Sequence, residues 1–174
     1  MQKMNISKKV ALVGILSATA TAISFLENAV SAFLPFGIKI GLSNIIVMFS
    51  AAFCGFPLTL CIVVIKSFFV LMTRGAFAFL MSISGGVISA CVIFIMLKKT
   101  RENFGFLGIG ISGALAYNIS QLFAAYIVMG NPVLYYVPIF SVISLLTGAL
   151  TGFAIYILIN RLTKNTSFME NSLL

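Results

Sequence analysis

The sequence has no aspartate, no histidine and only three acidic residues among 174. Charged side chains of both signs make up 8% of the residues, against about 25% in a soluble domain, whereas 61% are hydrophobic. A water-soluble fold of this size could not bury so much apolar surface. The composition therefore indicates a membrane protein.

The scarcity of metal ligands and of clustered charge excludes further classes. The three cysteines, Cys54, Cys61 and Cys91, have no histidine or aspartate beside them to complete a metal site, so we interpret them as packing residues. The net charge of +8 comes from basic residues at the ends of apolar segments, which is not the basic patch of a nucleic-acid-binding protein. We expect no metal, no cofactor and no nucleic-acid partner.

The apolar segments predict an all-α polytopic membrane protein, a bundle of six transmembrane helices. Crossing the hydrocarbon core takes about 20 helical residues. The predicted spans are Val10–Leu26, Ile40–Cys54, Pro57–Thr73, Ala76–Leu97, Phe104–Met129 and Val133–Asn160. The first resembles a signal peptide in its basic start, but no cleavage site leads into a soluble domain, so we interpret it as a retained span. The membrane domain then comprises residues 10–162. It is preceded by a short segment, residues 1–9, and followed by a disordered tail, residues 163–174.

The basic residues predict which ends face the cytoplasm. With the N-terminus inside, only Lys39 and Arg74 lie at the outer ends of spans. The cytoplasmic ends carry Lys3, Lys8, Lys9, Lys98, Lys99, Arg101, Arg161 and Lys164. By the positive-inside rule both termini are cytoplasmic, and we expect a multi-pass protein of the cell membrane.

Small residues recur along the first span at Ala11, Gly14, Ala18 and Ala22. Such a stripe lets a second helix approach closely, either inside the bundle or on a separate membrane subunit. At 100° per residue, Glu27 lies roughly 180° from Ala18 and about 140° from Ala22. The stripe and the acid therefore face different neighbours.

Lys66 is the most costly residue of the third span, because it lies roughly 15 Å from the inner end of that helix. A lysine at such depth costs on the order of 2.5–3.5 kcal/mol on insertion scales, so it should face the interior and find a partner. The partner is either Glu27, in a structural ion pair, or an anionic ligand. Arg74, roughly 12 Å nearer the outside, either extends to the outer headgroups or faces the same ligand.

Later spans add hydrogen-bonding and small side chains. The fourth contains Ser82, Ser84, Gly85, Gly86 and Ser89, for which close packing is the default interpretation. The fifth places Asn118 and Gln121, with Tyr117 and Ser120, in a polar band near the middle of the membrane. In the sixth, Gly148 and Gly152 form a common helix-packing motif with Ser141 and Ser144 beside it.

The unusual polar residues thus concentrate in the middle and outer half of the predicted bundle. We predict that they line an outward-facing pocket for a small anionic or polar molecule, with the stretch Phe36–Asn44 as its upper wall. The predicted pocket residues are Glu27, Asn28, Lys39, Asn44, Lys66, Arg74, Ser84, Asn118 and Gln121.

Three stretches resemble the Gx transporter family, which is also labelled heptaprenyl diphosphate synthase component I. They are Gly41–Asn44, Ser82–Ser89, and Gly108–Ala114 leading to Asn118–Gln121. That family is similar to the substrate-binding subunits (S components) of energy-coupling factor transporters. The resemblance implies six helices, cytoplasmic termini, an outward-facing pocket, and an alanine stripe that docks a transmembrane coupling subunit. Ala18 and Ala22 match that spacing, with Gly14 one turn earlier.

The family labels imply different functions. Prenyl diphosphate synthesis needs clustered carboxylates to hold magnesium, and Glu27, Glu102 and Glu170 are far apart in the sequence, so we expect no catalysis by this chain alone. An accessory role in polyprenyl diphosphate synthesis stays open, as does a purely structural scaffold. Because the sequence contains no nucleotide-binding motif, ATP-driven transport would need partner ATPase subunits.

Overall fold

The structure, a computed structural model, describes residues 6–31, 41–99 and 101–171, and within them the side chains of residues 7–27, 41–99, 105–133, 135 and 137–161. Over these ranges the fold is all-helical. Its elements are α1 (Ile6–Ser31), α2 (Asn44–Phe53), α3 (Phe56–Lys99), α4 (Arg101–Met129), the short 3₁₀ helix η2 (Asn131–Tyr136) and α5 (Val137–Asn171). Four helices are long and apolar enough to cross a membrane: Ser7–Glu27, Phe56–Lys99, Gly105–Met129 and Val137–Arg161.

Helix α3 folds back on itself at Gly75. The backbone there has φ 84° and ψ 180°, a region open essentially to glycine alone. The two arms run antiparallel, because the Ser67 and Ser82 hydroxyls hydrogen-bond at 3.1 Å and a Cβ on Gly86 would lie 2.6 Å from Val63 Cγ1. The reversal falls between Thr73 and Ala76, where the sequence predicted one span to end and the next to begin.

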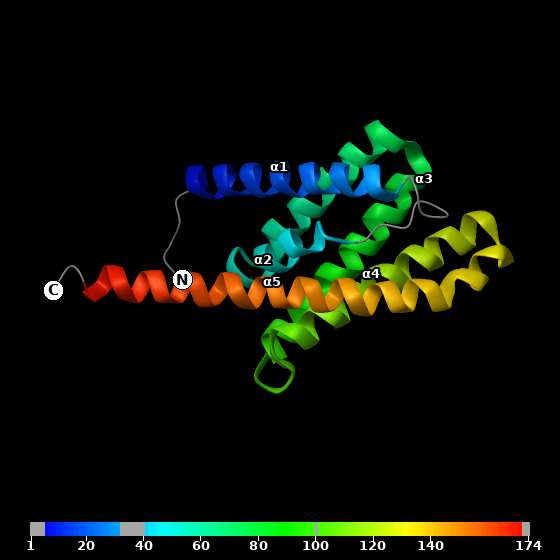
Figure 1. The fold of residues 1–174 in the computed structure, drawn as a ribbon. Helices are drawn as coiled ribbons and strands as arrows, with labels where there is room; N and C mark the ends of the chain where they lie inside the picture. Colours follow the sequence, from blue (N-terminus) through cyan, green and yellow to red (C-terminus); the bar gives the residue numbers. More distant parts are fainter. Residues whose placement is uncertain (1–5, 32–40, 100, 172–174) are drawn as a thin grey trace.

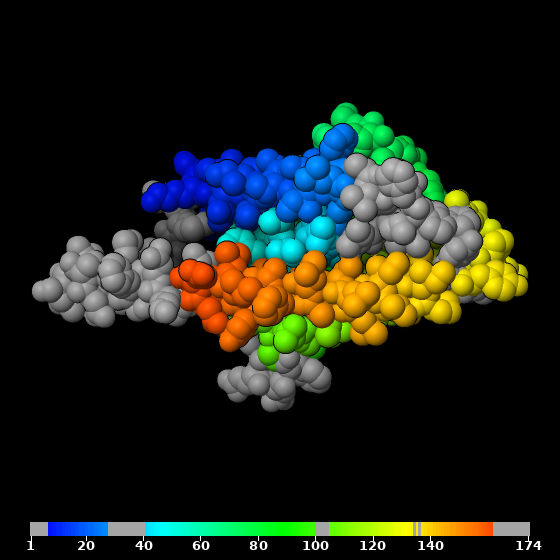
Figure 2. Space-filling model, in the orientation of Figure 1, coloured from blue at the N-terminus to red at the C-terminus, as the bar shows by residue number. Residues whose placement is uncertain are grey.

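Helix α2 is shorter than predicted. It begins at Asn44 rather than Ile40 and has 10 residues, so it rises about 15 Å, half the thickness of the hydrocarbon core. Figure 1 shows it between α1 and α5, which run in opposite directions, and Figure 2 shows its atoms in the gap between theirs. Val47, Met48 and Ala51 of α2 are buried in the core of the bundle.

Helix α5 is longer than predicted. Its backbone stays helical to Asn171, through part of the segment after Leu162 for which the sequence predicted a disordered tail. Its start also differs, because the residues before Val137 form the 3₁₀ helix η2 instead of the first turn of a span.

Glycines bring the backbones of α4 and α5 into direct contact. A Cβ on Gly148 would lie 2.5 Å from Ile111 Cα, and one on Gly110 would lie 2.5 Å from the Gly148 carbonyl oxygen. A Cβ on Gly152 would meet the Phe106 carbonyl oxygen at 2.6 Å. The predicted packing role of Gly148 and Gly152 is confirmed, with α4 as the neighbour.

Helix α1 presents opposite faces to the bundle and to its surroundings. Leu16 and Ala20 are buried against Ile62 of α3, whereas Gly14, Ala18 and Ala22 are exposed. A Cβ added at Gly14 would meet no described atom within 4 Å. The small-residue stripe therefore lies on the exposed side of α1 and is not packed against the described helices.

Candidate functional site

Lys66 lies at the centre of a polar cluster inside the bundle. Its side chain is fully buried, and its Nζ donates a hydrogen bond to Ser43 Oγ at 2.9 Å. The same ammonium lies 5.6 Å from the centroid of the Tyr117 ring, within the range of a cation–π interaction. The lysine thus joins the start of α2 to the middle of α4.

Glu27 holds the turn beside this lysine. It is 2% exposed, and its Oε1 accepts a hydrogen bond from the backbone N–H of Leu42, the residue before Ser43. Acid and lysine are therefore linked through two consecutive residues of the turn that precedes α2.

Asn118 forms a second part of the cluster. Its Nδ2 donates to Ser144 Oγ at 2.6 Å, and the Ser144 hydroxyl in turn donates to the Phe140 carbonyl oxygen. Asn118 Oδ1 is buried and has no hydrogen-bond partner among the described residues; the same holds for Asn44 Oδ1. Buried amide oxygens without a donor are rare and costly, so these two oxygens are open acceptors within the described part of the chain.

Gly85 makes room for the α4 side chains of the cluster. A Cβ at this position would lie 3.0 Å from the Tyr117 ring and 3.1 Å from Gln121 Cγ. Tyr117 and Gln121 are each 2% exposed. The predicted close packing of the fourth span is therefore seen at Gly85, with the polar band as its neighbour.

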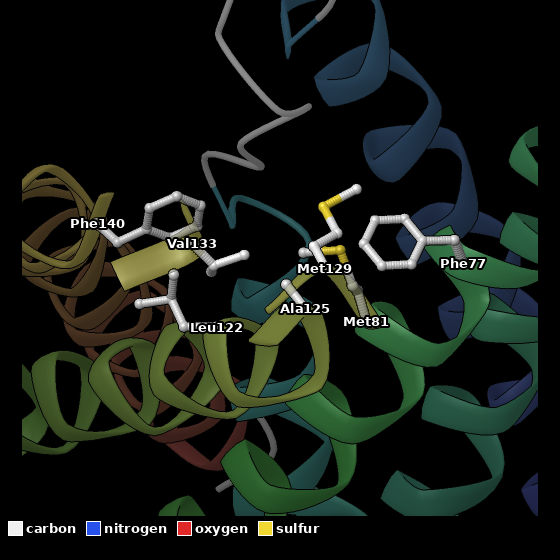
Figure 3. A pocket seen from close by; sticks show the side chains of 7 residues that line it. All are labelled: Phe77, Met81, Leu122, Ala125, Met129, Val133 and Phe140. Carbon is white, nitrogen blue, oxygen red and sulfur yellow. The ribbon is translucent and has the colours of Figure 1, made fainter. Parts of the chain in front are cut away.

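An apolar pocket lies one helical turn from the cluster. Ala125 follows Gln121 by four residues, Leu122 follows Asn118 by four, and Phe140 precedes Ser144 by four. The cavity measures about 30 Å³ and is lined by Phe77, Met81, Leu122, Ala125, Met129, Val133 and Phe140. Figure 3 shows the rings of Phe77 and Phe140 at opposite ends, with Met81 and Ala125 between them.

A sequence model of one family matches most of the chain. It is described as heptaprenyl diphosphate synthase component I and matches residues 16–158. The chain belongs to this family. The matched region runs from α1 to α5 and contains every residue of the cluster described above. Searches of curated proteins and of solved structures found no match.

The structure of this family member brings five of the predicted pocket residues into the polar interior. Each is at most 4% exposed: Glu27, Asn44, Lys66, Asn118 and Gln121. Arg74 is exposed at the reversal of α3, and the Ser84 hydroxyl bonds back to the Met81 carbonyl oxygen of its own helix. Lys39 and the side chain of Asn28 lie outside the described residues, as do residues 36–40 of the predicted upper wall.

Sequence reasoning missed two residues that complete the cluster. Ser43 belongs to the predicted upper wall Phe36–Asn44 but was not among the predicted pocket residues, yet it accepts the Lys66 hydrogen bond. Thr147 lies on the Ser144 face of α5, and a Cβ on Gly41 would lie 3.5 Å from Asn44 Nδ2 and 4.0 Å from Thr147 Oγ1. The position of Thr147, three residues after Ser144, is the one signal in the sequence that could have identified Thr147.

Proposed function

We propose that this protein is a substrate-binding subunit of a membrane transporter, comparable to an energy-coupling factor S component. It holds a small anionic or polar molecule in an outward-facing pocket. The observation that carries the proposal is the fully buried Lys66, whose described contacts come from residues before α2 and on α4. A buried ammonium is expensive in a bilayer, which favours a functional role at that depth.

The proposed topology has six crossings and cytoplasmic termini. The two arms of α3 count as two crossings, and α2 with its preceding residues as the short one. The positions of basic residues in the sequence support this orientation. The antiparallel course of α1 and α5 also supports it, since the start of α1 and the end of α5 lie toward the same end of the molecule (Figure 1).

The exposed face of α1 is the proposed contact with a transmembrane coupling subunit. Gly14, Ala18 and Ala22 lie in an open groove of about 630 Å³ between α1 and the first arm of α3, where Ile65 and Phe69 form the other wall. Small residues in such a groove allow a partner helix to approach closely. ATPase subunits would supply the energy through that partner.

Replacing Lys66 tests the binding role. In the purified protein, Lys66→Met should reduce the retention of a co-purified small molecule by at least about 30-fold, because removing one partner of a buried charge pair weakens binding by that factor. Native mass spectrometry measures the retention. Lys98→Met is the matched control, because that lysine is exposed at the end of the same helix. Wild-type retention by Lys66→Met would overturn the pocket.

The same variants separate ligand binding from internal charge balance. If Lys66 only balances Glu27, Lys66→Met destabilises the fold and Glu27→Gln restores it, since a glutamine oxygen can still accept from Leu42 N–H. Under the binding role, stability changes little and Glu27→Gln restores nothing. Chemical unfolding of the wild type, Lys66→Met, Glu27→Gln and the double variant distinguishes the two results.

Bulky residues on the α1 groove test docking. Ala18→Leu combined with Ala22→Leu should abolish co-purification with a membrane partner and leave ligand retention unchanged. Ala76→Leu, at an exposed alanine outside the groove, should change neither. Loss of ligand and partner together would refute separate surfaces for the two functions.

The description of the family favours a second candidate, a membrane accessory component of polyprenyl diphosphate synthesis. In that case a soluble prenyltransferase should co-purify with the chain, and prenyl transfer should fall when the chain is removed. The transporter subunit should instead co-purify with a membrane partner and an ATPase.

A further inference from the structure

We propose that the ligand is an amphipathic anion, with an N–H or O–H donor beside its anionic group and an apolar end of a few carbons. This inference rests on the proposed binding function and specifies its ligand. Its anionic end lies at Lys66, its donor at Asn118, and its apolar end in the pocket that contains Ala125 and Phe140.

The anionic end follows from the unused capacity of Lys66. An ammonium has three N–H donors, and the described residues supply one hydrogen-bond acceptor, Ser43 Oγ, together with the face of Tyr117. A carboxylate or phosphate oxygen is the strongest acceptor for the remaining donors.

The donor follows from the hydrogen bonds of Ser144. Its single hydroxyl proton goes to the Phe140 carbonyl oxygen at 2.6 Å, so its oxygen can only accept from Asn118. The Asn118 atom at that contact must then be the N–H₂ group, which fixes the amide orientation. Asn118 Oδ1 is consequently a buried acceptor that only a donor can satisfy, and no described residue provides one.

The apolar end follows from the position and walls of the pocket. Its residues continue the helical faces of Gln121, Asn118 and Ser144 by one turn, so the pocket lies next to the polar layer. Its walls offer a water molecule few hydrogen-bond partners, and dry apolar cavities accept apolar groups. Met81 and Met129 have flexible side chains that can adjust to a chain larger than the cavity of about 30 Å³.

A homologous series of 2-hydroxy acids contains all three parts and varies the length of the apolar end. Lactate, 2-hydroxybutyrate, 2-hydroxypentanoate and 2-hydroxyhexanoate share a carboxylate and an adjacent hydroxyl, and differ by one methylene each. Measured by thermal stabilisation of the full-length protein in detergent, affinity should rise about fourfold per methylene. A parallel series of monoalkyl phosphates distinguishes a carboxylate end from a phosphate end.

Three substitutions, at Ala125, Lys66 and Asn118, assign the three parts of the ligand. Ala125→Phe fills the pocket and should remove the dependence of affinity on chain length; Ala125→Leu serves if the first variant does not fold. Ala124→Phe, at the half-buried neighbouring residue, is the control.

Lys66→Met should weaken the binding of every acid in the series by a similar factor and keep the dependence of affinity on chain length. Removing the hydroxyl, as in hexanoate, should weaken wild-type binding about tenfold and should matter far less in Asn118→Ala.

Equal affinity along both series, or no binding of any member, would overturn the amphipathic ligand. The proposed function is judged separately, because retention of a co-purified molecule by wild type and its loss in Lys66→Met require no assumption about ligand class.

Discussion

The contact between α4 and α5 predicts that one added methyl group is disruptive. In Gly148→Ala the new Cβ would lie 2.5 Å from Ile111 Cα and 3.0 Å from the Gly110 carbonyl oxygen. Carbon atoms pack at about 3.5–4.0 Å, so the helices must separate by about 1 Å at this point. Both neighbours are backbone atoms, which cannot turn aside as a side chain can.

The cost can be estimated from two opposing effects. Overpacking of this kind costs about 1–3 kcal/mol, whereas replacing a helical glycine by alanine gains up to about 1 kcal/mol. Gly14→Ala isolates the gain, because a Cβ there meets no described atom within 4 Å. We expect Gly14→Ala to be neutral or stabilising, and Gly148→Ala to be less stable than Gly14→Ala by about 1–3 kcal/mol.

Unfolding in mixed micelles with increasing sodium dodecyl sulfate, followed by circular dichroism, measures that difference. Ligand retention should also fall in Gly148→Ala, because Ser144 lies one turn away and a shift of about 1 Å would stretch its 2.6 Å bond from Asn118 beyond hydrogen-bonding range. Equal stability of the two alanine variants would refute the close crossing of α4 and α5.

Two further predictions concern topology and the α3 reversal. A membrane-impermeant thiol reagent added outside intact cells should label a cysteine introduced at Asn131 and none of Cys54, Cys61 and Cys91; outside labelling of Cys54 would reverse the proposed orientation. Gly75→Ala should destabilise the protein by about 1–3 kcal/mol in the same unfolding assay, because alanine is strained at φ 84° and ψ 180°; unchanged stability would show that the reversal does not need glycine.

The sequence predicted features that depend on one helix or on neighbouring segments. The break at Gly75 and the packing of Gly148 follow from local residue type. The burial of Lys66 and Asn118 follows from the cost of polar groups in a bilayer. Each of these predictions requires only the periodicity of an α-helix and the properties of the bilayer, and both are known without the three-dimensional structure.

Features set by three or more helices were not predictable in this way. Whether Lys66 meets Glu27 or Ser43 depends on where the turn before α2 lies, and α2 proved shorter than a span. The 180° between Glu27 and Ala18 gave their relative directions, but not which of them faced the bundle. Arg74 was grouped with the pocket by depth alone, and its exposure reflects its place at the reversal of α3.

The pairing of the two α3 arms has a consequence for the order in which the protein is assembled. Ser67 and Ser82 are 15 residues apart and can meet as soon as both arms have left the ribosome. Tyr117, whose ring lies over the Lys66 ammonium, is synthesised 51 residues after the lysine. Ser43, the hydrogen-bond partner of Lys66, is already synthesised at that stage, so Tyr117 is the later of the two contacts to become available. The many valine, isoleucine, leucine and phenylalanine residues of the arm, at about −0.3 to −0.6 kcal/mol each, help to offset the charge during insertion. Apolar residues on the outer face of this arm, such as Ile65 and Phe68, are exposed in the finished fold and favour its insertion into the bilayer.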